Sequence, residues 1–570
     1  MQFILVYVIF PNKSIVQALN LKENVANHPK YHPNCDGRVE KLSSVSFWPL
    51  LGVFVVLASF WTVVAQAQLP AAPAAPRFDI QRFIIEGNTL IPKAEAEALV
   101  APFVGGNRDF GDVQRALEAL QQAYVERGYN ATRVLIPEQD LVAGQVRLEV
   151  IEARIRNVRV EGNKFFDSAN VRTSLPSVRE GEAPNRRRIG ENFQLANENP
   201  AKQARVVLET ADEPGRVDAV VRVTDSNPVR HSVFLDNTGR SSTGQLRAGY
   251  GFQHANMANR DQVLTAQVIT SPTYVSKVTI IGAGYRVPIY GLKGIVDVFA
   301  GYSDVNSGTV QDLFTVSGSG TILGVRYTQI LPRLDAYEQR LALGWDYRDF
   351  HNQVNVVGTA AGIVPDVTIK PLSLTYSGRY SQVGRDLSMF AGYSYNLPGG
   401  GDGGQEAFER TRAGARARYG ITRVGAAYTQ GLPRDLLVRG VVNAQYTTNA
   451  LVPGEQFGMG GMDNVRGYFE REAASDIGHR ATLEAYTPDW GQHLGTDWKA
   501  RMLMFYEWAR GRDNSPQRNG EVALSSFGLG LRMNQGKALS IRLDWAFVQN
   551  SAGTRQEGQD RLHFSLGYGF

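Results

Sequence analysis

Residues 561–570, RLHFSLGYGF, alternate between large apolar side chains and polar or small ones. Successive residues of an extended strand point to opposite faces, so one face of this segment is entirely apolar. The apolar positions are Leu562, Phe564, Leu566, Tyr568 and Phe570, and the opposite face carries Arg561, His563, Ser565, Gly567 and Gly569. The pattern predicts a β-strand with one side in an apolar environment and the other side in water.

The same alternation recurs in residues 341–348, 527–534 and 539–547. A soluble β-sandwich also alternates, but these polar faces carry paired charges and glycines, and the apolar faces end in aromatic residues. Both features are typical of the lumen and the interface girdles of a membrane barrel. Residues 227–570 have room for about sixteen strands of about 10 residues, closed into a ring because an open edge in lipid leaves backbone groups unpaired. We therefore predict an all-β membrane fold, a transmembrane barrel, for residues 227–570.

The last residue, Phe570, lies on the apolar face of its strand. A carboxyl-terminal phenylalanine in this position is the usual signal of an outer-membrane barrel. We therefore expect the lipid bilayer of the outer membrane and the barrel assembly machinery to be partners of this chain.

The amino-terminal region has the features of a secretory signal. Residues 47–64 contain no charge and are followed by Ala65-Gln66-Ala67, which predicts cleavage before Gln68. A single transmembrane anchor is the alternative, since the run is just long enough to span a bilayer. Residues 1–67 are thus interpreted as an extension plus signal peptide, with the true start near Val39, and residues 68–77 as a linker. Cleavage would remove Cys35, the only cysteine, and with it any disulfide, thiol nucleophile or cysteine metal site.

Composition and motifs argue against several functions. The formal net charge of the whole chain is only +5 and no dense basic patch is visible, so we expect no nucleic-acid partner. No HExxH, GxSxG or Walker sequence occurs. We therefore expect no enzymatic activity, no catalytic residue, no cofactor and no metal. The glycine-rich residues 399–404 are interpreted as an extracellular loop, because no Gly-Lys-Ser/Thr follows them.

A repeat precedes the predicted barrel. Residues 83–88, FIIEGN, are echoed by residues 158–163, VRVEGN, and each copy ends a strand in a Gly-Asn turn that tolerates positive φ. The patterns that follow predict two βααββ modules, residues 78–153 and 154–226. Open sheet edges in such small modules suit the capture of an extended polypeptide by strand addition, whereas mere spacers are the alternative.

Three sequence features together resemble the two-partner-secretion transporters of the ShlB/FhaC/HecB type, a branch of the POTRA-barrel superfamily. They are the repeated turns Gly87-Asn88 and Gly162-Asn163, the stretch 136–141 with Pro137, Gln139 and Asp140, and the sequence Val465-Arg466-Gly467-Tyr468. The resemblance implies a sixteen-stranded outer-membrane barrel behind two periplasmic α+β POTRA modules. Such a protein binds an unfolded secreted partner, a large adhesin or cytolysin, and exports it through the barrel. A general outer-membrane protein insertase is the alternative.

The resemblance also implies a candidate site, a long loop folded into the lumen with Arg466 at its tip. Members of this family usually have Phe-x-Asp on the inner wall of the barrel, with the acid holding the loop arginine. The match here is Phe505-Tyr506-Glu507, and strand parity turns Phe505 and Glu507 inward. Glu484, on the neighbouring predicted strand, is the second candidate acid. An arginine in a narrow, partly dry lumen requires such partners, and its planar fork suits carboxylates.

One departure from the family concerns the amino-terminal helix that plugs the barrel in many members. Between Gln68 and Phe78 there is only a short Pro/Ala-rich stretch, too short for a helix plus linker. If cleavage occurs as predicted, gating depends on the inward loop and on the modules.

Overall fold

The computed structural model describes residues 76–570 except 141, 305–307, 311–313, 317–318, 351–365 and 518–519. The predicted signal peptide, the start site and nearly all of the linker lie outside the described residues. The described residues divide into two compact units. One holds residues 76–123 and 134–150, and the other holds residues 124–133 and 151–570.

Residues 78–153 contain two small sheets and two main helices. The elements are β1 (Phe78–Ile80), β2 (Arg82–Glu86), α2 (Lys93–Val100), η2 (Ala101–Phe103), β3 (Gly105–Arg108), α3 (Phe110–Glu126), β4 (Arg133–Leu135) and β5 (Gln145–Ile151). The main sheet has the order β2-β5-β4, with β2 and β5 parallel, and β1 pairs with β3. Gly87, after β2, has φ +79°, and a Cβ there would lie 2.2 Å from the carbonyl oxygen of Val150. The turn therefore requires glycine.

Residues 154–226 repeat the βααββ order of β2, α2, α3, β4 and β5, without counterparts of β1 and β3 among the described residues. They form β6 (Arg154–Glu161), α4 (Ser168–Thr173), α5 (Arg186–Ala196), β7 (Lys202–Thr210) and β8 (Arg216–Asp225). The sheet order is β6-β8-β7, with β6 and β8 parallel. Gly162 has φ +83°, and a Cβ there would lie 2.5 Å from the carbonyl oxygen of Val223. The close approach between the first turn and the last strand is thus the same in both βααββ stretches.

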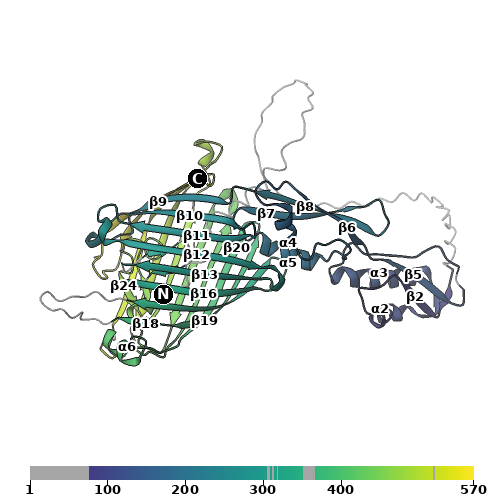
Figure 1. Ribbon diagram of the computed structural model, residues 1–570, viewed down its shortest axis with the longest axis horizontal. Helices are drawn as coiled ribbons and strands as arrows, with labels where there is room; N and C mark the ends of the chain where they lie inside the picture. The colour runs from purple at the N-terminus through teal and green to yellow at the C-terminus, as the bar shows by residue number, and fades with distance from the viewer. Residues whose placement is uncertain are drawn as a thin grey trace, which may run out of the picture. The chain divides into compact units, whose positions relative to one another are not determined.

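Most of the remaining strands form a closed antiparallel barrel (Figure 1). Pairing of β29 with β9 closes it. Its strands are β9 (Val229–Asp236), β10 (Arg247–Met257), β11 (Gln262–Thr270), β12 (Thr279–Ile289), β13 (Gly294–Ser303), β16 (Gly320–Ile330), β17 (Tyr337–Phe350), β18 (Val367–Ile369), β19 (Pro371–Gln382), β20 (Arg385–Asn396), β21 (Gly420–Gly431), β22 (Leu437–Tyr446), β25 (Ile477–Tyr486), β26 (Trp498–Arg512), β27 (Glu521–Gln535), β28 (Leu539–Val548) and β29 (Asp560–Gly569). Because β18 continues into β19, the described residues give sixteen spanning strands. The predicted fold class is confirmed.

The two faces of the wall strands differ as the alternation requires. On β26 the side chains of Met502, Met504 and Tyr506 are exposed on the outside, whereas those of Leu503 and Phe505 are buried. On β29 the exposed side chains are Leu562, Leu566 and Tyr568, while His563 on the opposite face is buried. An apolar outer surface around a polar interior is the arrangement that a lipid bilayer stabilises. No helix in the described part of the chain is both long and apolar enough to cross a membrane.

Two long connections lie at the end of the barrel opposite to the end where β9 begins. Residues 397–419 contain α6 (Gln405–Thr411) and include the glycine-rich stretch 399–404. Residues 447–476 contain a hairpin of β23 (Phe457–Met459) and β24 (Ala473–Ser475). The short remaining elements are β14 (Gly308–Val310), β15 (Phe314–Val316) and the 3-10 helices η3 (Ser241–Thr243), η4 (Val275–Lys277), η5 (Tyr290–Leu292), η6 (Pro433–Asp435), η7 (Pro453–Glu455) and η8 (Gly491–His493).

Candidate functional site

The connection 447–476, hereafter the inward loop, lies inside the barrel. Its hairpin carries a tip, residues 460–472, that contacts buried side chains on the inner faces of the wall strands. Gly467 in the tip has φ +95°, a region that glycine adopts readily. The tip reaches Glu484, which is two residues before the end of β25. Because Glu484 pairs with Phe505, the central residue of β26, the inward loop reaches about the middle of the wall.

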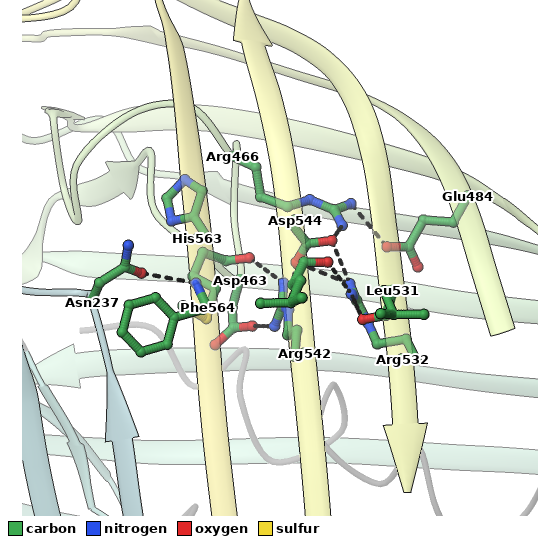
Figure 2. A network of polar contacts seen from close by, with 12 residues as sticks. Asn237, Asp463, Arg466, Glu484, Leu531, Arg532, Arg542, Asp544, His563 and Phe564 are labelled. Atoms are coloured by element: carbon green, nitrogen blue, oxygen red, sulfur yellow. Dashed lines mark hydrogen bonds and ion pairs between the residues drawn. The ribbon is translucent and has the colours of Figure 1, made fainter. Parts of the chain in front are cut away.

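Arg466 in the tip is bound by three carboxylates from three different strands. Figure 2 shows two of them, Glu484 and Asp544, beside the guanidinium. Its Nε and Nη2 donate to Oε1 of Glu507 on β26, at 3.0 and 2.7 Å. Nη2 also donates to Oε1 of Glu484 on β25 at 2.8 Å, and Nη1 donates to Oδ1 of Asp544 on β28 at 2.9 Å. The backbone N–H of Arg466 donates to the other oxygen of Glu507, Oε2, at 2.6 Å. Every nitrogen of this guanidinium thus has a carboxylate partner.

The Arg466 guanidinium also lies over the face of an aromatic ring. Its Cζ lies 3.4 Å from the ring centroid of Phe505, the residue two positions before Glu507 on the same inner face. The side chain of Arg466 is 1 % exposed. A desolvated cation over an aromatic face is worth about 2 kcal/mol or more. Phe505 therefore both stabilises the cation and keeps water from it.

The three acids differ in how many other partners they have. Glu484 also accepts from Arg439 at 3.1 Å, and Asp544 accepts from Arg532 and Arg542 at 2.8 and 2.7 Å. Glu507, within the part of the chain that the structure describes, hydrogen-bonds Arg466 and, at 3.4 Å, the Thr482 hydroxyl. Glu507 is therefore the acid that depends most on the inward loop.

The residues next to Arg466 fix the tip in place. The N–H of Gly467 donates to Nε2 of His563 on β29 at 2.9 Å, so this imidazole nitrogen carries no proton. The Tyr468 hydroxyl lies 2.6 Å from the carbonyl oxygen of Asn550 and 3.1 Å from that of Ser525. Val465 and Tyr468 are fully buried in one apolar cluster that also includes Phe457 and Met459 of β23. The tip and its hairpin consequently behave as one packed unit.

The structure brings together all the residues that the sequence suggested for the lumen: Val465, Arg466, Gly467, Tyr468, Phe505, Glu507 and Glu484. Sequence reasoning missed two partners, Asp544 and His563. Both lie on strand faces that the alternation identifies as polar, so strand parity predicts that their side chains point into the barrel. It could not give their position along the barrel or around it.

The other predicted residues have local roles in the two modules. The side chain of Gln139 pairs with the backbone of Arg147 on β5, accepting from its N–H at 2.6 Å and donating to its carbonyl at 2.9 Å. It thereby imitates a neighbouring strand, next to Pro137 and Asp140 in the same connection. Asn88 accepts from the N–H of Ile91 at 3.2 Å, and Asn163 donates to the carbonyl of Phe166 at 2.8 Å. The described residues include no group of three or more His, Cys, Asp or Glu side chains arranged for a metal ion.

Phe570, the proposed carboxyl-terminal signal, lies on the outer face of the barrel. Its ring stacks on the His231 ring with centroids 5.5 Å apart, and its backbone N–H donates to the carbonyl of His231 at 2.9 Å. The last residue therefore contributes to the closure between β29 and β9.

Comparisons with known proteins agree with this architecture. The family model of ShlB-type POTRA domains matches residues 78–153, and that of the haemolysin secretion/activation proteins ShlB/FhaC/HecB matches residues 215–533. The chain is 24 % identical over 423 residues to the outer membrane transporter CdiB of Dickeya dadantii, covering 73 % of this chain and 74 % of the relative. It is 27 % identical over 183 residues to CdiB of Escherichia coli O6:K15:H31, covering 32 % of this chain and 31 % of the relative.

Solved structures show the same fold. CdiB from Escherichia coli superimposes with a TM-score of 0.71 at 18 % identity, covering 89 % of this chain and 93 % of that one. CdiB from Acinetobacter baumannii gives a TM-score of 0.64 at 15 % identity, with 88 % and 91 % covered. The matched barrel and module, together with the loop arginine held in the lumen, lead to one conclusion: the chain belongs to the haemolysin secretion/activation family ShlB/FhaC/HecB, the outer-membrane transporters of two-partner secretion.

Proposed function

We propose that the inward loop is the gate of this transporter and that the Arg466 cluster holds the gate closed at rest. As an outer-membrane transporter with its POTRA region in the periplasm, the protein exports a large secreted partner. The observation that carries the proposal is a loop arginine, 1 % exposed, bound inside the barrel by acids from β25, β26 and β28. A polypeptide cannot pass a lumen in which this loop is docked. The loop must therefore move, and the ion pairs set the free energy of that movement.

Capture of the partner is assigned to the two modules, residues 78–153 and 154–226, with residues 227–570 as the barrel. The second stretch has the same order of elements and the same tight Gly-Asn turn as the first, which supports its interpretation as a second POTRA module. Strands β4 and β7 each lie at an edge of their sheet. On β7 the side chains of Val207 and Leu208 are exposed. An edge strand with free backbone groups and apolar side chains can bind an extended segment of the partner by strand addition.

The partner is proposed to be an unfolded exoprotein of the adhesin or cytolysin class, with no nucleic acid involved. Transport requires no catalytic residue in this mechanism. Folding of the partner outside the cell favours outward movement, because the folded protein cannot return through the lumen. The barrel assembly machinery is proposed to insert the chain into the membrane.

A reversible crosslink between the tip and the wall tests the gate. A Cβ at Gly467 would lie 3.5 Å from the Cβ of Ala546 on β28, within the range for a disulfide. The variant Gly467→Cys/Ala546→Cys, in a Cys35→Ala background, should secrete nothing when oxidised and should recover secretion under reductant. Each single cysteine variant is the matched control for strain at Gly467. Wild-type secretion by the oxidised, fully crosslinked protein would show that the loop need not move.

A further inference from the structure

A second buried ion-pair cluster binds the inward loop in the segment that precedes its hairpin. Glu455, at the end of η7, precedes the hairpin, and its side chain is 1 % exposed. Its Oε1 accepts from Nη1 of Arg348 on β17 at 2.5 Å, and its Oε2 lies 3.4 Å from Nη2 of Arg423 on β21. The backbone carbonyl of Glu455 accepts from Nε2 of Gln445 on β22 at 3.1 Å. A carboxylate of the loop is thus bound by cations of the wall, the reverse of the arrangement at Arg466.

The two clusters together attach the loop along half of the barrel wall. With β18 and β19 counted as one strand, the order from β17 runs through β19, β20, β21, β22, β25, β26 and β27 to β28, which is eight steps around a ring of sixteen. Glu455 binds Arg348 on β17, and Arg466 binds Asp544 on β28. These two contacts lie half a ring apart, and the other partners lie on the strands between them, Arg423 on β21, Gln445 on β22, Glu484 on β25 and Glu507 on β26, so the loop is attached along the half of the wall from β17 to β28.

The clusters also lie at different depths. Arg348 is two residues before the end of β17, and Arg423 is three residues after the start of β21, so both are near the end of the barrel that the loop enters. Glu484, a partner of Arg466, pairs with Phe505 midway along β26 and therefore lies deeper in the barrel. Between them, Phe457 of β23 packs in one buried cluster with Val465 and Tyr468 of the tip. A packed body attached along half of the wall remains held by one cluster when only the other is released.

The charged partners of Glu455 indicate that it anchors the loop and does not merely stabilise the wall. Arg348 has a second partner, Asp346, on its own strand, and Arg423 donates to Oε1 of Gln445 at 2.8 Å. Both wall arginines therefore keep a polar partner when the loop leaves. Glu455, in contrast, makes both of its salt bridges with the wall, among the residues described. Its contacts stabilise the docked loop more than they stabilise the wall.

We propose that Glu455 is a second anchor of the gate, which together with Arg466 spans the lumen, and that opening requires both anchors to release. The proposal rests on the proposed function of the loop as a gate. It assigns Glu455 as a positioning residue, because it acts through the loop and not on the exported polypeptide.

Labelling of a buried cysteine in the tip measures loop release. Met462 is buried in the tip, so Met462→Cys in the Cys35→Ala background reacts with a membrane-impermeant thiol reagent only when the tip undocks. Glu455→Gln should raise the labelling rate on the order of 10-fold or more, since losing one partner of a buried pair strongly favours the undocked state. In the Arg466→Ala background the increases should multiply. Glu406→Gln is the matched control, because Glu406 lies exposed in α6 on the other long connection, 86 % exposed and 3.9 Å from Arg410.

The outcomes distinguish failure of the second anchor from failure of the loop as a gate. If Glu455→Gln behaves like Glu406→Gln, both alone and with Arg466→Ala, the second anchor is wrong, whereas the gate still stands or fails by the crosslink at Gly467 and Ala546. Heat-modifiability on gels confirms that each barrel is folded. Should Glu455→Gln fail to assemble, Glu455→Asp retains the charge but retracts the carboxylate by one methylene. It should give a smaller increase in labelling, and a rate equal to the control would overturn the proposal.

Discussion

Replacing Arg466 by alanine tests the central ion-pair cluster most directly. The change removes four charge-assisted hydrogen bonds to Glu507, Glu484 and Asp544, and the contact with the Phe505 ring. Removing one partner of a buried ion pair costs about 3–5 kcal/mol, mainly because the other charge is left unpaired, whereas an exposed pair is worth less than about 1 kcal/mol. Since about 1.4 kcal/mol corresponds to a tenfold change in an equilibrium constant, the undocked population of the loop should rise on the order of 100-fold or more.

The structure also predicts which second substitution compensates. In Arg466→Ala, Glu484 keeps Arg439, and Asp544 keeps Arg532 and Arg542. Glu507 alone loses its ionic partner. Adding Glu507→Gln should therefore recover more of the lost stability than adding Glu484→Gln or Asp544→Asn, because it removes the stranded charge.

The assay is urea-induced unfolding of the barrel in lipid vesicles, combined with secretion of the partner and thiol labelling at Met462→Cys. Arg466→Lys should recover only part of the docking, since an ammonium cannot bind a carboxylate with two parallel hydrogen bonds. Equal compensation by all three second substitutions would refute the assignment of Glu507 as the dependent acid. Stability and secretion of Arg466→Ala at wild-type levels would refute the buried cluster as the lock.

Three further predictions concern the modules and the loop. Deleting residues 78–153 should abolish secretion while leaving a heat-modifiable barrel in the outer membrane, and normal secretion after the deletion would exclude capture by that module. Gly162→Ala should destabilise the second module, because the φ of Gly162 is +83° and the new Cβ would lie 2.5 Å from the carbonyl oxygen of Val223. Thermal unfolding of the purified transporter measures this effect. The control is Gly190→Ala, since a Cβ at Gly190 would meet nothing within 4 Å. Burial, reinforced by the nearby Asp463 charge, raises the pKa of Glu470 in the inward loop from 4.5 to about 7. The docked loop favours the protonated acid, so docking is most stable below about pH 4.5 and weakens as the pH rises through 7. Labelling at Met462→Cys, corrected for the pH dependence of the thiol reaction, should rise over this interval and lose that dependence in Glu470→Gln.

The class of the fold and the composition of its wall follow from local sequence patterns. Alternation in residues 561–570 and in stretches such as 539–547 is a local property with a period of two, so it assigns each side chain to the inside or the outside without any knowledge of the neighbouring strands. The positive φ of Gly87 and Gly162 in the repeated Gly-Asn turn is equally local, whereas their close approach to the last strand of the module is a tertiary contact. Resemblance to a known family then pointed to Arg466 and Glu507.

Which inward-facing groups meet depends instead on contacts between distant parts of the chain. Asp544 was assigned to the polar face of β28, but its contact with Arg466 depends on the closure of the ring and on the register of β25 through β28. Glu455 carried no signal at all, because its partners Arg348 and Arg423 are 107 and 32 residues away in the chain and come from different strands. Parity fixes the side of the wall to which a residue points. The angle around the barrel and the depth within it are set by the summed strand registers, which no single stretch of sequence contains.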